Sequence, residues 1–290
     1  MALDNKDSSV PLVYTQLSAP DRIRLLRIAA PTSDLSIVVS FEEAGLQDKV
    51  EYHCLSYTWD GPKYRDEGEH WTTNHKRIVC NGMVAHIRQN LHDALLQLRD
   101  LDMLGPIWID ALCINQEDVL ERNSQVGHMG EIYKGATQVI VWLGKEDEHT
   151  KIALTSLGRS KFDVDEWIKD NSLGLREYLR CSFSDEELHS IHCFTGERRW
   201  FSRLWIVQET VLARHTSFLC GAHGVQVETI CTAVVFLRYG TFPPHYDDIL
   251  KLGVLHSKKF LEALRYSYSR LRAIGWVIHT FRESKSTDPR

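Results

Sequence analysis

Residues 107–144 read IWIDALCINQEDVLERNSQVGHMGEIYKGATQVIVWLG, and this stretch decides the fold class. Its pattern predicts a short strand at 107–110, a helix over about 117–135 and a buried strand at 139–143. Parallel strands joined by a helix form a β-α-β unit, whose right-handed crossover aligns the carboxyl ends of both strands. Because ligands of such sheets bind at those ends, the sequence predicts an α/β fold with a site there.

The flanking sequence adds shorter elements of both kinds. Asn81-Gly82 supplies the two positive φ angles of a type I′ turn, which predicts a hairpin over 77–87. Asn90 has the character of a helix N-cap with Asp93 at the third helical position. The other predicted elements are a strand at 51–57, a second hairpin at 216–227, and helices at 151–158, 185–194 and 201–213.

Composition and charge exclude several classes of protein. The chain has 290 residues, of which 43% are apolar and 25% charged, as in a folded globular protein with a sizeable core. Its net charge is −5, so the chain lacks the positive field that gathers nucleic acid. No apolar run approaches the roughly 20 residues of a membrane span, and residues 1–9 lack the apolar segment of a secretory signal. We therefore expect a cytosolic or nuclear protein without nucleic-acid partners or transmembrane segments.

Cysteine and histidine spacing predicts free thiols and no metal site. The seven cysteines are scattered without a C-x-x-C pair, and none of the 14 histidines forms H-x-x-x-H or H-E-x-x-H. Cys113 lies near Asp110 and formally permits a thiol nucleophile, but no histidine is singled out as its base. We expect neither a metal nor a resident cofactor.

Polar residues among large aromatic residues mark three candidate site segments, at 55–61, 107–116 and 199–209. In the first segment, Tyr57 and Trp59 could stack on an adenine or nicotinamide ring or pack beneath their loop. In the second, Asp110 could contact a ligand, cap the following helix or hold Arg122, and Asn115-Gln116 could equally cap that helix.

The third segment carries a tryptophan and a glutamate four residues apart. Trp205 and Glu209 would share one face of a helix, so the indole could partly desolvate the carboxylate. The alternatives are that Glu209 is a surface acid paired with Arg203 or Arg214, and that Trp205 anchors the core.

Four blocks of sequence, in order, resemble the fungal heterokaryon-incompatibility (HET) domain. They are LSYTWDG (55–61), NLHDALLQLR (90–99), residues 107–144 quoted above, and RWFSRLWIVQE (199–209). The resemblance covers about residues 22–221, with one departure at Asp60, where the family pattern suggests glycine. It implies a fungal cytoplasmic protein that triggers programmed cell death when non-self is detected, with an upstream non-self receptor as a possible partner.

The chain is also similar to the TIR fold, in its strand with Ser56-Tyr57, its β-α-β unit and its Trp-x-x-x-Glu. This resemblance implies a TIR-like core of parallel strands flanked by helices, here with β-hairpins and a helical C-terminal part. It also implies cleavage of NAD⁺, as a substrate, at the nicotinamide-ribose bond by a self-associated protein. Glu209 would be the catalytic residue, and the residues expected to bind NAD⁺ are Ser56, Tyr57, Trp59, Asp110 and Trp205. The alternative is a non-enzymatic signalling or adaptor module that kills by recruiting partners.

The sequence suggests three regions. These are an N-terminal extension at 1–21, a HET domain at 22–240 whose TIR-like core spans about 50–221, and a basic helical segment at 241–290. Residues 251–290 contain nine Lys or Arg and three acidic residues. Such a stretch could contact an anionic membrane or an acidic partner, but it is more often a solvated helix that leads to another domain. The polar loop at 63–76 is long for a simple connection and could reach a neighbouring copy.

Overall fold

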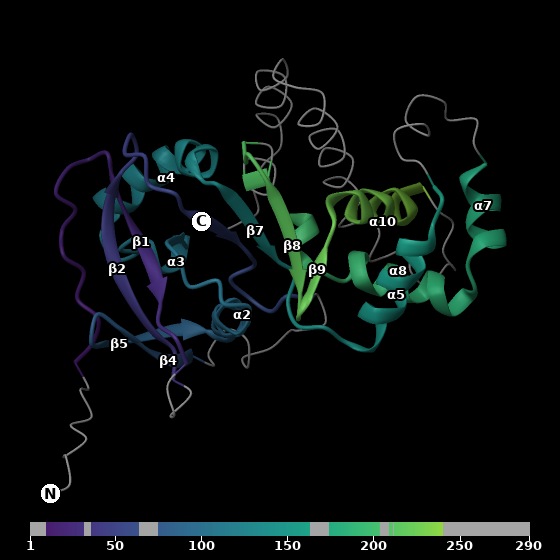
Figure 1. Cartoon of the computed structure of the whole chain (residues 1–290), viewed down its shortest axis with the longest axis horizontal. Coiled ribbons are helices and arrows are strands. Elements are labelled where there is room, and N and C mark those ends of the chain that lie inside the picture. The colour runs from purple at the N-terminus through teal and green to yellow at the C-terminus, as the bar shows by residue number, and fades with distance from the viewer. Residues whose placement is uncertain are drawn as a thin grey trace, which may run out of the picture.

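The protein has a mixed α/β fold, as its sequence predicts (Figure 1). The computed structural model describes residues 10–31, 36–63, 75–162, 174–203, 209–210 and 212–239. The strands within these ranges are β1 (Arg22–Ile28), β2 (Val38–Gly45), β3 (His53–Ser56), β4 (His75–Cys80), β5 (Met83–Arg88), β6 (Ile107–Trp108), β7 (Gln138–Trp142), β8 (Thr216–Cys220) and β9 (His223–Val225). The helices are α2 (Gln89–Asp100), α3 (Asp110–Cys113), α4 (Val119–Gly135), α5 (Glu148–Arg159), α7 (Leu175–Ser182), α8 (Asp185–Gly196) and α10 (Val227–Tyr239), with a 3₁₀ turn, η1, at Arg199–Ser202.

One sheet contains these nine described strands, in the order β5-β4-β2-β1-β6-β3-β7-β8-β9. Its centre, β6-β3-β7-β8, is parallel, with Cys54 of β3 opposite Trp108 on one side and Val139 on the other. The two strands of the predicted β-α-β unit are therefore parallel, but β3 lies between them. The carboxyl ends of β6, β3 and β7 meet at one edge of the sheet.

The sequence analysis did not predict β1 and β2, which pair antiparallel along their whole length. Most of β1 is buried, and α3 packs against it. The run RIRLLRI lacks the alternation of a half-exposed strand, because this strand is covered on both faces. The signal that could have identified it is the group of Ile and Leu residues at positions 23, 25, 26 and 28.

Both predicted hairpins are confirmed. Asn81 and Gly82 have φ angles of 51° and 77°, as a type I′ turn between β4 and β5 requires. The second hairpin joins β8 to β9, and Gly221 in its turn also has positive φ.

The predicted N-cap of α2 is wrong. The cap residue is Arg88, and Asn90 lies inside the helix with its side chain buried. The Asn90 amide donates to the carbonyl of Thr58 at 2.7 Å and accepts from Trp142 Nε1 at 2.9 Å. Asn90 therefore connects the helix to the ends of β3 and β7 rather than to its own backbone.

The start of α4 is set by a residue that the sequence analysis did not consider. Asp118 accepts hydrogen bonds from the backbone amides of Leu120 and Glu121, whereas the sequence had offered Asp110 or Asn115-Gln116 as alternative caps. The helix predicted over 201–213 also differs, because η1 ends at Ser202, Arg203 is extended, and residues 204–208 are outside the described part.

Helices α5, α7, α8 and α10 gather at one end of the molecule, beyond β8 and β9 (Figure 1). The sequence predicted α5 and α8 but not α7 or α10. Edge-to-face and tilted ring contacts among four aromatic residues hold this part together: Phe162, Tyr178, Phe183 and Phe236. The basic segment 241–290 lies outside the described residues.

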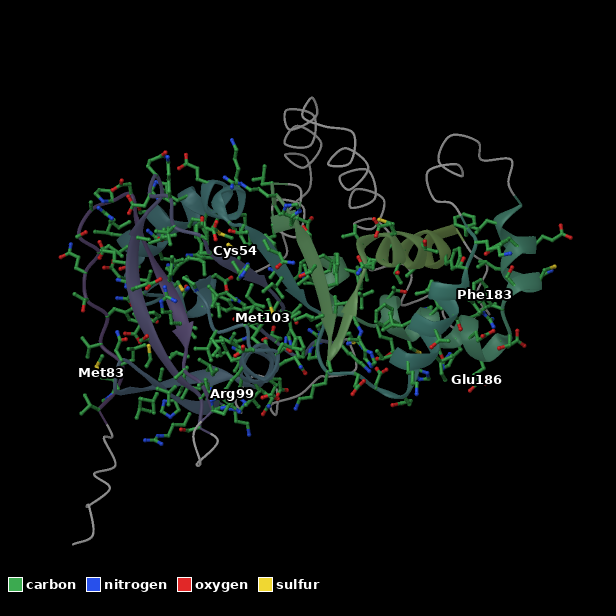
Figure 2. The ribbon with its side chains drawn as sticks, in the orientation of Figure 1. Cys54, Met83, Arg99, Met103, Phe183 and Glu186 are labelled. Carbon is green, nitrogen blue, oxygen red and sulfur yellow. The ribbon has the colours of Figure 1, made fainter. Side chains whose placement is uncertain are left out.

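All seven cysteines are free thiols, as predicted. Cys54 lies in the interior of the sheet (Figure 2). Within the described ranges, no helix has the length and apolar character needed to cross a bilayer.

A buried ion pair joins β1 to the first turn of α4. Arg24 donates to Glu121 at 2.5 and 2.9 Å, and the two side chains are only 6% and 10% exposed. Arg24 also donates to the carbonyls of Cys113 and Thr15. Burial alone would raise the pKa of Glu121, but hydrogen bonds from Arg24 and the Asn115 amide lower it below its usual range. This pair fixes the crossover helix against the antiparallel half of the sheet.

We expect Glu121→Gln to lower the free energy of unfolding by about 3–5 kcal/mol, because it leaves the Arg24 guanidinium buried without a counter-charge. Glu42→Gln is the matched control, since Glu42 pairs with Arg27 at the surface and its loss should cost less than about 1 kcal/mol. Urea unfolding monitored by tryptophan fluorescence measures both. Equal effects of the two substitutions would contradict the importance of the buried pair.

Candidate functional site

The candidate site lies at the carboxyl ends of β3 and β6. Ser56 is the last residue of β3, and Asp110 follows β6 as the first residue of α3. The two strands are parallel neighbours, so both polar side chains reach the same edge of the sheet. The β-α-β pattern predicted a site at the carboxyl ends of β6 and β7, but it did not predict that β3, which carries Ser56, lies between these strands.

Glu209 joins this edge from a distant part of the chain and is completely buried. Its carboxylate accepts a hydrogen bond from Ser56 Oγ. It also accepts two hydrogen bonds from the Arg203 guanidinium, at 2.9 and 3.3 Å. Ser56 Oγ in turn accepts from Trp200 Nε1 at 2.8 Å. A chain of hydrogen bonds therefore runs from Trp200 through Ser56 to Glu209, and a guanidinium neutralises the carboxylate. The expected pairing with Arg203 is present, but in the interior rather than at the surface.

Asp110 is a second buried carboxyl group. Trp59 Nε1 donates to its two oxygens at 3.1 and 3.2 Å, and the Ala111 amide donates at 2.8 Å. Burial raises the pKa of Asp110 to about 6, although Arg203 and these two donors oppose the shift. A carboxyl pKa raised in this way is typical of groups that donate or accept a proton in a reaction.

The predicted pair of Asp110 with Arg122 is wrong. Arg122 donates to the carbonyl of Gln116 at 2.9 Å, and in the described part of the chain no ion pair joins it to Asp110. The Gln116 side chain donates to the Asp110 carbonyl at 2.8 Å. The loop after α3 is therefore held by hydrogen bonds from the Arg122 and Gln116 side chains to backbone carbonyls, and the Asp110 carboxyl accepts from Trp59 and from the Ala111 amide.

Glu209 and Asp110 share one electrostatic neighbourhood. Burial alone would lower the pKa of Arg203, but the attraction of Glu209, with a smaller contribution from Asp110, raises it above its ordinary value. Burial raises the pKa of Tyr133 well above its usual range, and both carboxylates add to that shift. Two acids and one arginine therefore form a compact charged group within an otherwise aromatic surrounding.

The structure separates the two aromatic residues expected to contact a ring. Tyr57 is 2% exposed and belongs to the core, whereas Trp59 keeps part of its surface exposed. The Arg88 guanidinium lies 5.9 Å from the centre of the Trp59 ring and pairs with Asp60. Trp205 lies outside the described residues.

A buried cluster of charges holds the loop after β3 in place. Lys63 and Arg198 both pair with Asp147, whose pKa falls to about 2 because these partners and Thr150 outweigh the effect of burial. Arg198 also donates to the carbonyl of Leu143 at 2.6 Å.

Glycine is required where this loop meets the end of β7. Gly144 has a φ of +98°, and a Cβ there would lie 2.6 Å from Pro62. The loop from Trp59 to Lys63 is thereby pinned between the segment after β7 and η1.

Sequence reasoning did not name Trp200, Arg203 or Arg198 as functional residues. All three lie in or beside the RWFSR motif, so the signal was the clustering of arginine and tryptophan before Glu209. The thiol alternative finds no support, because burial raises the pKa of Cys113 to about 12 and its sulfur accepts from the Ile109 amide.

The site lies within a stretch of the chain that is shared with a known family. Residues 52–209 match the family described as "Heterokaryon incompatibility protein (HET)", and this range runs from just before β3 to Glu209. The chain belongs to the HET family. It is also 31% identical over 231 residues to "Heterokaryon incompatibility protein 6, OR allele" of Neurospora crassa. That match covers 67% of this chain and 32% of the relative, so the chain spans about a third of that protein's length. No solved structure matches the chain.

The matched region of the HET domain contains both carboxylates and the residues that hold them. The expected limits of 22–221 extend beyond it at both ends and include β1 and β2. These two strands lie before residue 52, yet Arg24 of β1 fixes the crossover helix of the domain.

We expect Asp110→Asn to gain stability relative to the wild type as the pH rises from about 4 to about 6. A folded pKa of about 6 against 3.8 unfolded means that the folded wild type binds the extra proton in this window and loses stability as the pH rises through it. The full difference should be on the order of 3 kcal/mol. Urea unfolding of both proteins at pH 4, 5, 6 and 7 measures it, and a constant difference across this range would contradict the elevated pKa.

Proposed function

We propose that this chain is the effector part of a fungal heterokaryon-incompatibility protein that triggers cell death on detection of non-self. The proposal rests on its membership of the HET family and on the relative whose name carries the same function. An upstream non-self receptor would be its activating partner.

We further propose that the effector consumes NAD⁺ and that Glu209 is its catalytic residue. The observation that carries this proposal is a carboxylate, held by Ser56 and Arg203, at the carboxyl ends of parallel strands. Nucleotides bind at this edge in α/β sheets. In this proposal the parallel centre of the sheet corresponds to a TIR-like core, and the partly exposed Trp59 stacks on a ring of the substrate.

The chemistry needs only one carboxylate. Water replaces nicotinamide at the ribose C1′, so the glycosidic C–N bond breaks, its electron pair neutralises the pyridinium, and a proton is released with ADP-ribose. Because nicotinamide leaves as a neutral molecule, no general acid is required, in contrast to most glycosidases. Glu209 would accept hydrogen bonds from the ribose hydroxyls and stabilise the developing positive charge. Arg203 would turn from Glu209 to the diphosphate, which a guanidinium binds in a bidentate manner.

Self-association would free Glu209 from its ion pair with Arg203. In the described structure Glu209 is fully buried and ion-paired, as expected of a resting state in which the carboxylate is withheld from substrate. A neighbouring copy, which the sequence predicts to be contacted through residues 63–76, would move Arg203 and complete the pocket; residues 64–74 lie outside the described part of the chain. Head-to-tail contacts of this kind generate rings or filaments.

A second candidate function is a non-enzymatic adaptor that recruits partners through the same domain. The same ion pair favours it, because a fully buried Arg203–Glu209 pair also serves to fix the local conformation. The two functions differ in whether NAD⁺ is consumed. They also differ in whether killing requires the charge of Glu209 in a variant that folds normally.

We expect Glu209→Gln to abolish nicotinamide release, with a loss of at least about 10²-fold, because the amide keeps the volume and loses the charge. The single variant also leaves the Arg203 charge buried and should be less stable. The double variant Arg203→Met with Glu209→Gln removes both charges and should recover most of that stability. Nicotinamide release and urea unfolding are measured on all three proteins.

The outcome for the double variant separates the two functions. A folded double variant that neither cleaves NAD⁺ nor kills fungal cells on expression supports the enzyme. A folded double variant that still kills would overturn the enzymatic proposal in favour of the adaptor. Glu146→Gln, which alters an exposed carboxylate paired with His223, is the matched control and should leave both readouts unchanged.

We expect specific activity to rise steeply with protein concentration and with fusion to an oligomerising domain, because the pocket is completed between copies. NAD⁺ loss per molecule across a hundredfold dilution series measures this dependence. An active enzyme with constant specific activity across the series would mean that a monomer is self-sufficient.

A further inference from the structure

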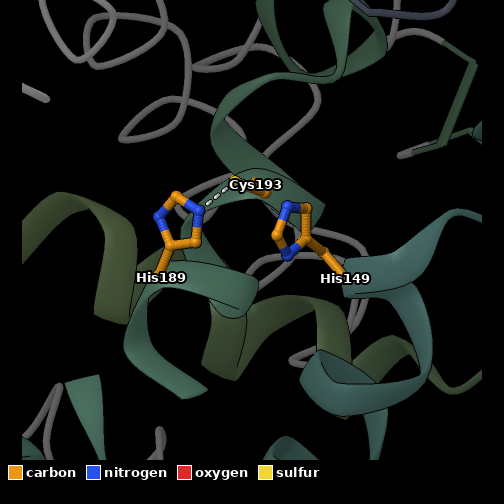
Figure 3. A group of neighbouring side chains, drawn as sticks. All are labelled: His149, His189 and Cys193. Atoms are coloured by element: carbon orange, nitrogen blue, oxygen red, sulfur yellow. Dashed lines mark hydrogen bonds between the residues drawn. The ribbon is translucent and has the colours of Figure 1, made fainter. Parts of the chain in front are cut away.

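Two histidines and a cysteine meet at the junction of α5 and α8, away from the candidate site. His149 lies in the first turn of α5, whereas His189 and Cys193 are one turn apart on α8 (Figure 3). One potential ligand atom from each lies within 4.8 Å of the other two. The two helices pack against each other, so the fold itself brings the three side chains together.

The spacing of the His189 and Cys193 donor atoms fits two ligands of one tetrahedral metal ion. His189 Nε2 and Cys193 Sγ are 3.6 Å apart. Bond lengths of about 2.0–2.1 Å to nitrogen and 2.3 Å to sulfur at a tetrahedral angle separate the two ligand atoms by about 3.5 Å. Residues four apart on a helix share one face, so a single ion can reach both without distortion of α8. The imidazole rings of His149 and His189 lie on either side of Cys193, edge to face, with ring centres 4.9 Å apart (Figure 3).

Each nitrogen of His149 has a neighbour that can orient the ring. Nδ1 is 3.3 Å from Ser190 Oγ, and Nε2 is 3.8 Å from a carboxylate oxygen of Glu148. A histidine ligand of a metal commonly uses its second nitrogen in this way, which fixes the tautomer and the ring orientation. Ser190 is thus within hydrogen-bond distance of Nδ1, whereas Glu148 would have to approach Nε2 more closely to bond it.

The donor set selects the kind of metal. One thiolate and two imidazoles suit zinc and related transition metals, whereas magnesium and calcium prefer oxygen ligands. Cys193 is buried and the His149 side chain is 18% exposed, so the ion would be reached from solvent past the histidines. Three protein ligands leave a fourth position for water or for a carboxylate such as Glu148.

We propose that His149, His189 and Cys193 bind a Zn²⁺ ion that ties α5 to α8. Cysteine and histidine spacing did not predict this site, because the third ligand comes from another helix and the His189–Cys193 pair matches none of the motifs considered above. Metal binding would stabilise the folded arrangement of the helical end, since the three ligands converge only there. The proposal is independent of the reaction proposed above.

The test uses the full chain freed of metal by a chelator and titrated with Co²⁺, which replaces Zn²⁺ and gives a visible spectrum. We expect one equivalent to bind with a thiolate-to-cobalt charge-transfer band and the intense visible absorption of a tetrahedral ion. Zn²⁺ should displace it, and Zn²⁺ at about 100-fold excess over its dissociation constant should raise the melting temperature by about 5–10 °C.

The variants identify the ligands. Cys193→Ala should lose the charge-transfer band and the thermal shift, and His149→Gln should weaken Co²⁺ binding at least tenfold while leaving the thiolate band detectable at high metal. Cys181→Ser is the matched control, because Cys181 is an exposed thiol on α7 and its loss should change neither readout. Absence of the band in the wild type, or an equal band in Cys193→Ala, would overturn the proposal. If Cys193→Ala fails to fold, His149→Gln with unaltered Co²⁺ affinity would overturn it as well.

Discussion

The constraint on which this structure depends is that a carboxylate buried at the end of a parallel sheet must be neutralised. Glu209 has no exposed surface, and the free energy of burying its charge is offset by Arg203 and by hydrogen bonds. Ser56 donates to it from the end of β3, and Trp200 of η1 donates to Ser56. Satisfying this one charge thereby fixes the central strand, the 3₁₀ turn and the segment at Glu209 relative to one another.

The same requirement recurs at two other places and gives the domain its rigidity. Arg24 and Glu121 join the antiparallel part of the sheet to the crossover helix, and Lys63, Arg198 and Asp147 hold the loop after β3. In each case a charge from one segment is buried only because a distant segment supplies the counter-charge. Breaking a pair leaves an uncompensated charge, whereas removing both partners costs far less. The double variant proposed for Arg203 and Glu209 relies on this difference.

In the proposed mechanism, activation changes how these buried charges are paired. Asp110 is buried with a pKa raised to about 6, and Trp59 beside it retains exposed surface. In the resting arrangement both acids are occupied by protein donors. A substrate with a diphosphate and a cationic ring offers partners of both signs, so it could exchange for those contacts when copies of the chain associate. The proposed zinc site belongs to the helical end and would stabilise a different part of the molecule.

The sequence by itself determined the α/β class, both hairpins, most helices and the edge of the sheet where the site lies. These features follow from local periodicity, from the φ requirement of Asn81-Gly82 and from the geometry of β-α-β units, all of which act over short stretches of chain. Ser56 and Asp110 lie in segments that were named for polar residues at predicted strand ends, whereas Glu209 was singled out through the resemblance to the TIR fold. Only the tertiary structure decided the partners of these groups: Trp59 rather than Arg122 for Asp110, Arg203 rather than Arg214 for Glu209, and Asn90 as a link to Trp142 instead of a helix cap. Partners of buried polar groups are chosen by proximity in space, because a buried charge takes whichever donor the packing brings to it, and sequence distance carries no information about that choice. The three residues proposed to bind zinc illustrate the same limit, since two helices had to pack before their ligands could meet.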